Sequence, residues 1–231
     1  LWKIKKLSAI ITLTHADARF WNIYNTKIYV IPNMITITPK DVKDYSVKRI
    51  ISVGRFTYQK GFDLLIEAWN IVSKQYTDWQ LTIYGNENPD IYLNQLKQYQ
   101  LGESIKFLPA TPNIVEKYSE SSIYVMSSRF EGFPLVLGEA MSCGLPCVSF
   151  DCPNGPKEII KNGVDGFLVE NGNINALAET MEKLMSDTNL RKNMGQKAKL
   201  NIQRLSEKAI MDRFLRLAKQ IVTCENVALE N

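Results

Sequence analysis

Short apolar runs alternate with segments of helical periodicity along most of this 231-residue chain. The runs are typical of strands buried on both faces, whereas the segments between them place apolar residues three or four positions apart. Such alternation with short connections is typical of a parallel sheet that helices cover on both faces. The sequence therefore predicts an α/β fold with a doubly wound parallel sheet. The strands are expected at 50–54, 80–84, 105–107, 123–126, 146–150 and 166–169, and the helices near 61–75, 90–100, 113–119, 134–143 and 154–161, with three more from 173 to the end.

The beginning of the chain does not fit that alternation. Strand-like runs at 9–14 and 27–31 flank one helix-like segment, which is too little to enclose a core of its own. The next stretch holds Pro32 and Pro39 without a helical period, as is typical of a linker. The predicted organisation is a remnant of another domain at 1–31, a linker at 32–48, a ligand-binding domain at 49–205, and a C-terminal helix and tail at 206–231.

A turn and a helix follow the fourth predicted strand. Pro134 suits the first helical position, where its missing N–H costs nothing, while Gly144 and Pro146 are typical of the helix end. The free backbone N–H groups near Phe133 and Leu135 then face outward at the positive end of the helix dipole. This arrangement predicts an anion-binding helix N-terminus.

Two carboxylates accompany this helix. Glu131 lies just before it and Glu139 about two turns later. A simple structural explanation exists, because Glu131 complements the helix dipole and Glu139 is a good helix former on a solvent-exposed face. The spacing alone does not decide between that explanation and a binding role.

A second pattern lies at the first strand-to-helix turn, where Gly54 and Arg55 follow a buried-strand run and Lys60 precedes a helix. Open α/β sheets bind ligands at such turns. Arginine offers a planar fork for two phosphate oxygens, and lysine offers a point charge. Two solvated loop residues are the alternative. Together, the basic turn and the helix with its carboxylates are the groups that a pyrophosphate flanked by sugars needs.

These residues carry a resemblance to a known family. The chain resembles the donor-binding half of a retaining glycosyltransferase of the fourth glycosyltransferase family, which has the GT-B fold. The resemblance extends from about Thr12 to Val222, and each motif alone is weak. The matching motifs are Gly54-Arg55-x4-Lys60-Gly61, Glu131-Gly132-Phe133-Pro134 and Glu139-Ala140-Met141.

The resemblance implies retaining transfer from a nucleoside-diphosphate sugar, a UDP-hexose or UDP-N-acetylhexosamine, to a hydroxyl of a glycan or lipid-linked acceptor in surface polysaccharide biosynthesis. It assigns catalytic roles to Glu131, Arg55 and Lys60: the basic pair binds the leaving diphosphate, and Glu131 binds the sugar. Glu139 accepts hydrogen bonds from the ribose hydroxyls. The further donor-binding residues implied are Gly54, Gly85, Pro109, Phe133, Pro134 and Leu135.

The same resemblance implies that most of an acceptor-binding domain is missing from the chain, so that these residues alone transfer no sugar. It also implies that the final helix packs on that other domain, through a stripe that includes Ile210, Phe214 and Leu217. No metal cofactor is expected, because no Asp-x-Asp motif occurs to bind one beside the diphosphate. Asn113 is expected to cap a helix.

Two other functions stay open at this point. A nucleotide-sugar epimerase on the same fold needs no acceptor, and a non-catalytic nucleotide-binding module needs no catalytic residue. The presence of Arg55, Lys60, Glu131 and Glu139 together argues against the second, since a decayed site has no reason to keep them.

Charge, apolar stretches and cysteine spacing limit the kinds of binding partner and the cellular location that the sequence allows. The net charge of +4 is scattered without a dense basic run, which argues against nucleic-acid binding. No apolar stretch approaches the ~20 residues of a membrane span. The spacing of Cys143, Cys147 and Cys152 does not suit zinc, so buried thiols in a reducing compartment are expected. We expect a cytoplasmic protein, with the inner face of the membrane as a place of peripheral association.

Overall fold

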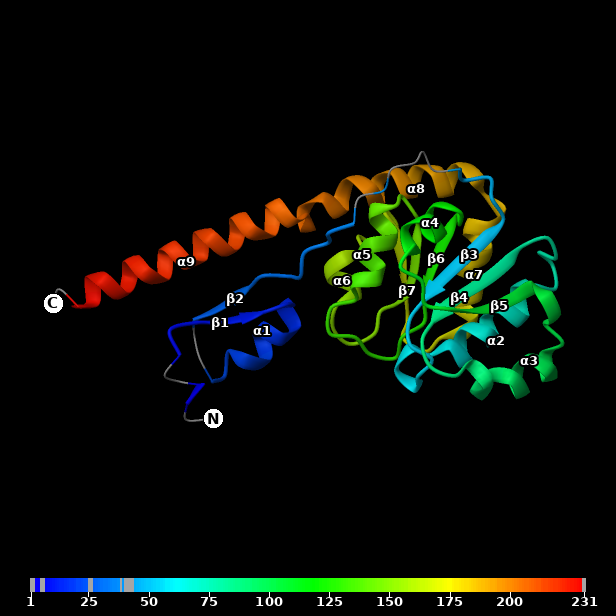
Figure 1. Ribbon diagram of the computed structural model, residues 1–231, viewed down its shortest axis with the longest axis horizontal. Helices are drawn as coiled ribbons and strands as arrows, with labels where there is room; N and C mark the ends of the chain where they lie inside the picture. The colour runs from blue at the N-terminus through cyan, green and yellow to red at the C-terminus, as the bar shows by residue number, and fades with distance from the viewer. Residues whose placement is uncertain (1–2, 5–6, 25–26, 38, 40–43, 230–231) are drawn as a thin grey trace. The chain divides into compact units, whose positions relative to one another are not determined.

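The chain is described here by a computed structural model, which covers residues 3–4, 7–24, 27–37, 39 and 44–229, with side chains as far as residue 222 (Figure 1). It divides into two compact units. We call Ile37–Ile202 the sheet unit, and Leu1–Thr36 with Gln203–Asn231 the terminal unit.

The sheet unit is built on six parallel strands in the order β5-β4-β3-β6-β7-β8. The chain winds from β3 outward to β5, then crosses to β6 on the other side of β3 and winds outward again. The predicted doubly wound α/β fold is therefore confirmed, and all six predicted strands are present. They are β3 (Arg49–Val53), β4 (Gln80–Gly85), β5 (Ile105–Pro109), β6 (Ile123–Met126), β7 (Cys147–Phe150) and β8 (Gly166–Val169).

The two central strands part toward their carboxyl ends. β3 pairs with β4 over five residues but with β6 only at Ile50↔Ile123 and Ile51↔Tyr124. Beyond this ladder the Ser52 hydroxyl donates a buried hydrogen bond of 2.7 Å to the carbonyl of Val125. The point at which winding reverses thus lies between β3 and β6, and open α/β sheets bind ligands outside the strand ends at such a point.

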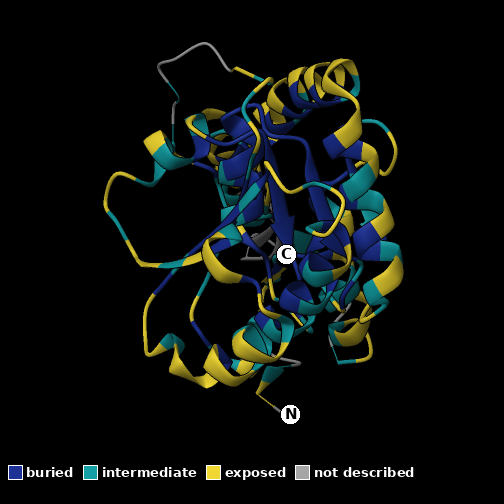
Figure 2. Cartoon of the chain, turned by 90° about the vertical axis from the view of Figure 1, so that its right-hand side faces the viewer, coloured by how far each residue is buried: buried dark blue, intermediate teal, exposed yellow. Residues whose placement is uncertain are grey.

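Helices cover both faces of this sheet (Figure 1). Helix α2 packs against α7, and α5 packs against α8. Figure 2 shows central strands that are buried, with β6 and β7 buried along their whole length, and helices whose outer sides are exposed. The helices of this unit are α2 (Phe62–Val72), α3 (Leu93–Tyr99), α4 (Ile114–Ser119), α5 (Leu135–Ser142), α6 (Pro156–Ile159), α7 (Ile174–Ser186) and α8 (Thr188–Asn201).

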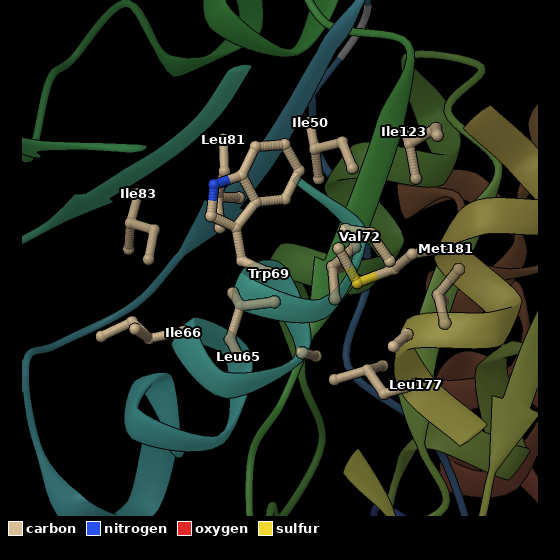
Figure 3. Packing of buried hydrophobic residues seen from close by; sticks show 14 of the residues in the cluster. Ile50, Leu65, Ile66, Trp69, Val72, Leu81, Ile83, Ile123, Leu177 and Met181 are labelled. Atoms are coloured by element: carbon tan, nitrogen blue, oxygen red, sulfur yellow. The ribbon is translucent and has the colours of Figure 1, made fainter. Parts of the chain in front are cut away.

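Helix α2 shows how the sequence forms the core. It begins after Gly61, whose left-handed φ of 62° ends the preceding turn. Its apolar stripe is buried, with Leu65, Ile66 and Trp69 at 0% exposure. In Figure 3 this stripe lies between the strand side chains and the residues of α7. Burial of each such side chain stabilises the fold by about 1.5–3 kcal/mol.

The terminal unit holds β1 (Ile10–Thr12), α1 (His15–Trp21), β2 (Ile28–Val30) and α9 (Glu207–Leu229). The two strands pair in parallel. Thr14 caps α1, because its hydroxyl oxygen accepts a hydrogen bond of 3.1 Å from the backbone N–H of Asp17. Arg213 of α9 donates one of 2.9 Å to the carbonyl of Val30.

Part of the predicted linker belongs to this unit. The backbone N–H of Ile35 donates to the carbonyl of Leu205, and residues 38 and 40–43 lie outside the described residues.

On α9, Leu217 is buried and Phe214 is 45% exposed, so the stripe is covered only in part. Among the described helices, none has the length and apolar character needed to cross a bilayer. The assignment of residues 1–31 to an acceptor-binding domain stays a prediction.

Candidate functional site

The turns after β3 and β6 meet at the carboxyl edge of the sheet, beside the point where winding reverses (Figure 1). There, Lys60 Nζ lies 2.6 Å from Glu131 Oε1. The side chains are only 14% and 7% exposed. Two motifs that are 71 residues apart in sequence therefore form one charged pair, shielded from solvent, at the place where this fold class binds ligands.

The backbone around Lys60 shapes this pair. A Cβ on Gly54 would lie 3.1 Å from Cγ and Cδ of Lys60, so the lysine stem runs directly over the glycine. The carbonyl of Lys60 accepts a hydrogen bond of 3.0 Å from the Ser127 hydroxyl. Gly54 thus contributes to the site by leaving room for the lysine, while its predicted contact with a donor stays a prediction.

Besides Lys60, two hydrogen bonds hold Glu131, one to its side chain and one from its backbone. The Ser128 hydroxyl donates a hydrogen bond of 2.7 Å to Oε1, the oxygen that also contacts Lys60. The backbone N–H of Glu131 donates to the carbonyl of Pro153, at 3.2 Å, from the turn after β7. The carboxylate therefore has a fixed orientation and does not sample solvent freely.

Arg55 belongs to the same turn but not to the buried pair. Its guanidinium is exposed and lies 3.5 Å from Gln59 Oε1, which is a long contact. The structure thus brings Lys60 and Glu131 together and leaves Arg55 at the rim. Its predicted role toward a phosphate remains a prediction.

The start of α5 differs by one residue from the prediction. Pro134 is the N-cap, with φ −76° and ψ 91°, and the helix begins at Leu135, so its assignment to the first helical position is wrong. The reason is that proline fixes φ and leaves ψ free, and here ψ is extended. A Cβ on Gly155 would lie 2.4 Å from Cδ of Pro134, so the turn after β7 packs against this cap. Phe133 is buried beside it, and Leu135 is 41% exposed.

Glu139, on α5, is oriented from α4. The hydroxyl of Tyr118 donates a hydrogen bond of 3.2 Å to Glu139 Oε2. Burial raises the pKa of Glu139, and the hydrogen bond from Tyr118 acts in the opposite direction. Burial also raises the pKa of Tyr118 well above its ordinary value, so the phenol stays protonated and remains a donor. The half-buried carboxylate is thus not the solvated helix former of the simple explanation.

Gly85 and Pro109 lie side by side at the ends of β4 and β5. A Cβ on Gly85 would lie 2.2 Å from the carbonyl oxygen of Gly54, so close packing of the chain against itself already explains this glycine. Asn113 occupies the N-cap position of α4, but its side chain makes no capping hydrogen bond, which contradicts the expected cap. Its backbone N–H donates instead to the hydroxyl oxygen of Thr111.

Three cysteines are buried in the sheet unit, and of these only Cys152 follows the carboxyl end of a strand, β7. Cys143, Cys147 and Cys152 are buried thiols. Burial, with a smaller contribution from Glu131, raises the pKa of Cys152 to about 12, so it stays a thiol. Within the described residues, no three His, Cys, Asp or Glu side chains gather as a metal site requires.

Sequence reasoning did not identify three residues that shape the site: Ser128, Tyr118 and Arg129. Ser128 lies two residues after a predicted strand end, a position that favours functional side chains, so a local signal existed. Tyr118 carried no such signal, because it acts on Glu139 from another helix. Arg129 contacts a residue 66 positions away.

The family of the chain follows from sequence comparison. Residues 35–201, most of the chain, match the family described as "Glycosyl transferases group 1". The chain belongs to this family, and its doubly wound sheet and the site at the strand ends are consistent with that membership.

Individual relatives agree with the family. The chain is 36% identical over 195 residues to an uncharacterized glycosyltransferase of Haemophilus influenzae, covering 83% of this chain and 55% of that protein. It is 39% identical over 159 residues to the amylovoran biosynthesis glycosyltransferase AmsD of Erwinia amylovora, covering 68% and 44%. The chain therefore spans about half the length of the curated relatives it matches.

Solved structures show the same architecture. A mutant of Staphylococcus aureus TarM, in complex with Fondaparinux, alpha-GlcNAc-glycerol and UDP, superposes with a TM-score of 0.84 at 28% identity. The match covers 94% of this chain and 45% of that one.

Proposed function

We propose that this chain is the donor-binding part of a retaining glycosyltransferase of the fourth glycosyltransferase family. Its donor is a UDP-hexose or UDP-N-acetylhexosamine, and its acceptor is a hydroxyl of a glycan or a lipid-linked sugar. The observation that carries the proposal is the shielded Lys60–Glu131 pair, 2.6 Å apart, at the point where the winding of the sheet reverses.

The chemistry of glycosyl transfer suits these groups. As the bond between sugar and diphosphate breaks, negative charge grows on the diphosphate and the sugar becomes cationic. Positive groups fixed on the diphosphate then bind more tightly in the transition state than in the ground state, which accelerates the reaction. Lys60 and Arg55 take this role with the first N–H groups of α5, and Glu131 binds the sugar.

Glu139 supplies the contact with the nucleoside. An ionised carboxylate only accepts hydrogen bonds, so it suits a pair of ribose hydroxyls. Burial raises the pKa of Glu139, and the hydrogen bond from Tyr118 to Oε2 opposes that rise, so it favours the ionised form that the ribose requires.

The relatives support the choice of donor and pathway. TarM was solved with UDP, and AmsD is named as an amylovoran biosynthesis glycosyltransferase. We extend both to this chain, and place the protein in surface polysaccharide biosynthesis with peripheral association at the inner face of the membrane. Transfer proceeds without a metal, because the cationic side chains and the helix N-terminus neutralise the diphosphate.

Thermal unfolding of this chain with a panel of nucleoside diphosphates and their sugars tests the proposal. We expect UDP and one or more UDP-sugars to raise the midpoint through binding to the folded state. Stabilisation by other diphosphates with none by UDP would contradict the assignment of the donor.

The full-length protein separates the remaining functions. With donor and a glycan or lipid acceptor, we expect a product that keeps the anomeric configuration of the donor, while this chain alone gives none. Conversion of the donor without any acceptor would instead indicate an epimerase, and equal transfer by the chain alone would show that the acceptor site lies within these residues.

A further inference from the structure

We propose that Arg129 is a positioning residue that locks the turn after β3 onto the turn after β6, and so holds Lys60 against Glu131. The consequence for diphosphate binding rests on the proposed function of that pair.

Arg129 makes a two-pronged ion pair with the start of α2. Its Nη1 lies 2.8 Å from Asp63 Oδ1, and its Nη2 lies 2.5 Å from Asp63 Oδ2. Parallel bonds of this kind fix direction as well as distance. Asp63 is in the first turn of α2, where an acidic residue already complements the helix dipole. The dipole explains the acid but not the arginine that reaches it from the turn after β6.

The same guanidinium also holds the residues that precede Lys60. Nη1 donates a hydrogen bond of 2.8 Å to the carbonyl of Tyr58, and the guanidinium carbon lies 4.0 Å from the centre of the Tyr58 ring. Arg129 thus contacts the chain on both sides of Lys60, at positions 58 and 63.

Backbone and amide contacts add to this junction. The backbone N–H of Arg129 donates a hydrogen bond of 2.8 Å to the carbonyl of Gln59. The side-chain amide of Gln59 in turn donates a hydrogen bond of 3.1 Å to the carbonyl of Phe130, the residue before Glu131. Every one of these contacts joins the stretch 58–63 to Arg129 or Phe130, and none of them uses Lys60 or Glu131 themselves.

This arrangement separates positioning from binding. A lysine and a carboxylate on two loops lose rotamer freedom when they are held 2.6 Å apart. If the loops could separate, this entropic cost would recur each time the pair formed again. A junction that fixes the loops independently keeps the charges in place for a ligand, so less reorganisation is needed on binding. Lysine at position 129 keeps the charge but has no fork, so it cannot restore the junction fully.

The first test needs no nucleotide. Lys60 acetylation in this chain is followed by mass spectrometry and compared with that of Lys117, whose side chain is 28% exposed and paired with Glu120. For Arg129→Gln we expect Lys60 to react about tenfold faster, equivalent to a loss of about 1.4 kcal/mol in protection, with Lys117 unchanged. Arg129→Lys should fall between, and Asp63→Asn should resemble Arg129→Gln.

Arg49→Gln is the matched control, because Arg49 pairs with Glu120 at the opposite end of β3. It should leave the Lys60 rate unaltered. An unchanged Lys60 rate in Arg129→Gln, or equal acceleration of Lys60 and Lys117, would overturn the proposal, the latter by showing a general loss of stability. If Arg129→Gln does not fold, the same comparison is made with Arg129→Lys.

The second test measures the consequence for the ligand. In calorimetry we expect Arg129→Gln to weaken UDP about tenfold and uridine less than about twofold. Equal weakening of both ligands would contradict a role through Lys60. If the unaltered chain binds no UDP, the proposed function fails, while the acetylation rates still decide the role of Arg129.

Discussion

The two ends of strand β3 carry ion pairs of opposite character. At its amino end, Arg49 lies 3.4 Å from Glu120, with side chains that are 39% and 46% exposed. Beyond its carboxyl end, Lys60 lies 2.6 Å from Glu131, with side chains that are 14% and 7% exposed. The same strand thus presents a solvated pair at one end and a shielded pair at the other.

The difference supports the proposal that the carboxyl end of β3 belongs to the binding site. An exposed pair is screened by water and contributes at most about 1 kcal/mol. A buried pair must overcome the cost of removing two charges from water, so stability alone is a poor reason to have one. A shielded pair at the ligand-binding edge of the sheet is therefore better explained by function than by folding.

The largest effect is expected from breaking the shielded pair. Lys60→Ala leaves Glu131 buried without its cation, and we expect a loss of about 3 kcal/mol in the free energy of unfolding. The variant K60M/E131Q removes both charges, so it should recover most of that loss. Denaturant unfolding measures both, and a Lys60→Ala cost no greater than that of Arg49→Ala would remove the contrast between the two ends.

A somewhat smaller effect concerns the ligand. Arg55→Ala and Lys60→Ala should each weaken UDP by about 1.5–3 kcal/mol, because each removes a charge-assisted contact with phosphate. Uridine, which has no phosphate, should bind these variants nearly as it binds the unaltered chain. Calorimetry with both ligands checks this, and equal losses for the two would show that neither residue touches phosphate.

A third prediction concerns Glu139, which also lies at the carboxyl edge of the sheet, and the dependence of the free energy of unfolding on pH. Because burial raises its pKa in the folded state, the folded protein binds the proton more tightly than the unfolded chain. The stability that protonated Glu139 contributes is therefore present below the unfolded pKa and is lost as pH rises through the folded one. Glu139→Gln should gain stability relative to the unaltered chain at neutral pH, and this gain should vanish in acid.

Tyr118→Phe extends that prediction. Loss of the hydrogen bond removes the influence that lowers the pKa of Glu139, so the pKa should rise further. We expect a cost of about 1 kcal/mol at neutral pH, and UDP affinity that declines at a higher pH during acidification. The titratable groups facing Glu139 are Tyr118 from α4 and Tyr124 from β6. An unshifted affinity profile in Tyr118→Phe would show that this hydrogen bond does not control Glu139.

The smallest effect belongs to the amino end of β3. Arg49→Gln should change the free energy of unfolding by less than about 1 kcal/mol, because the pair is solvated. It should not change UDP affinity at all, since the residue lies at the opposite edge from the site. A loss of UDP binding in this variant would mean that the edges of the sheet have been assigned wrongly.

Local patterns were enough to predict the sheet and one half of the site. The apolar runs predicted all six strands, and apolar residues three or four positions apart predicted the helices between them. The charges at Lys60 and Glu131 follow strands that turned out to be neighbours, so the general geometry of open sheets brought them together. That prediction requires only that each residue follows the carboxyl end of a strand in the same sheet.

What could not be predicted depends on contacts between distant segments. Nothing near Asp63 in the sequence shows that Arg129 reaches it, and nothing near Tyr118 shows that Glu139 is its partner. The prediction for Pro134 is wrong by one residue, because the proline ring fixes φ but not ψ. Its ψ is extended where the residue packs against the turn at Gly155. Asn113 has a favourable cap composition, but its side chain does not cap.

The most direct test of the account is calorimetry of UDP in excess chelator, with the unaltered chain and with the K60M/E131Q variant. We predict that the unaltered chain binds UDP equally well with and without the chelator, and that the variant loses this binding although it remains folded. Equal affinity of the two proteins for UDP would contradict the claim that Lys60 of the shielded pair binds the diphosphate. Loss of binding on chelation would contradict metal-free recognition.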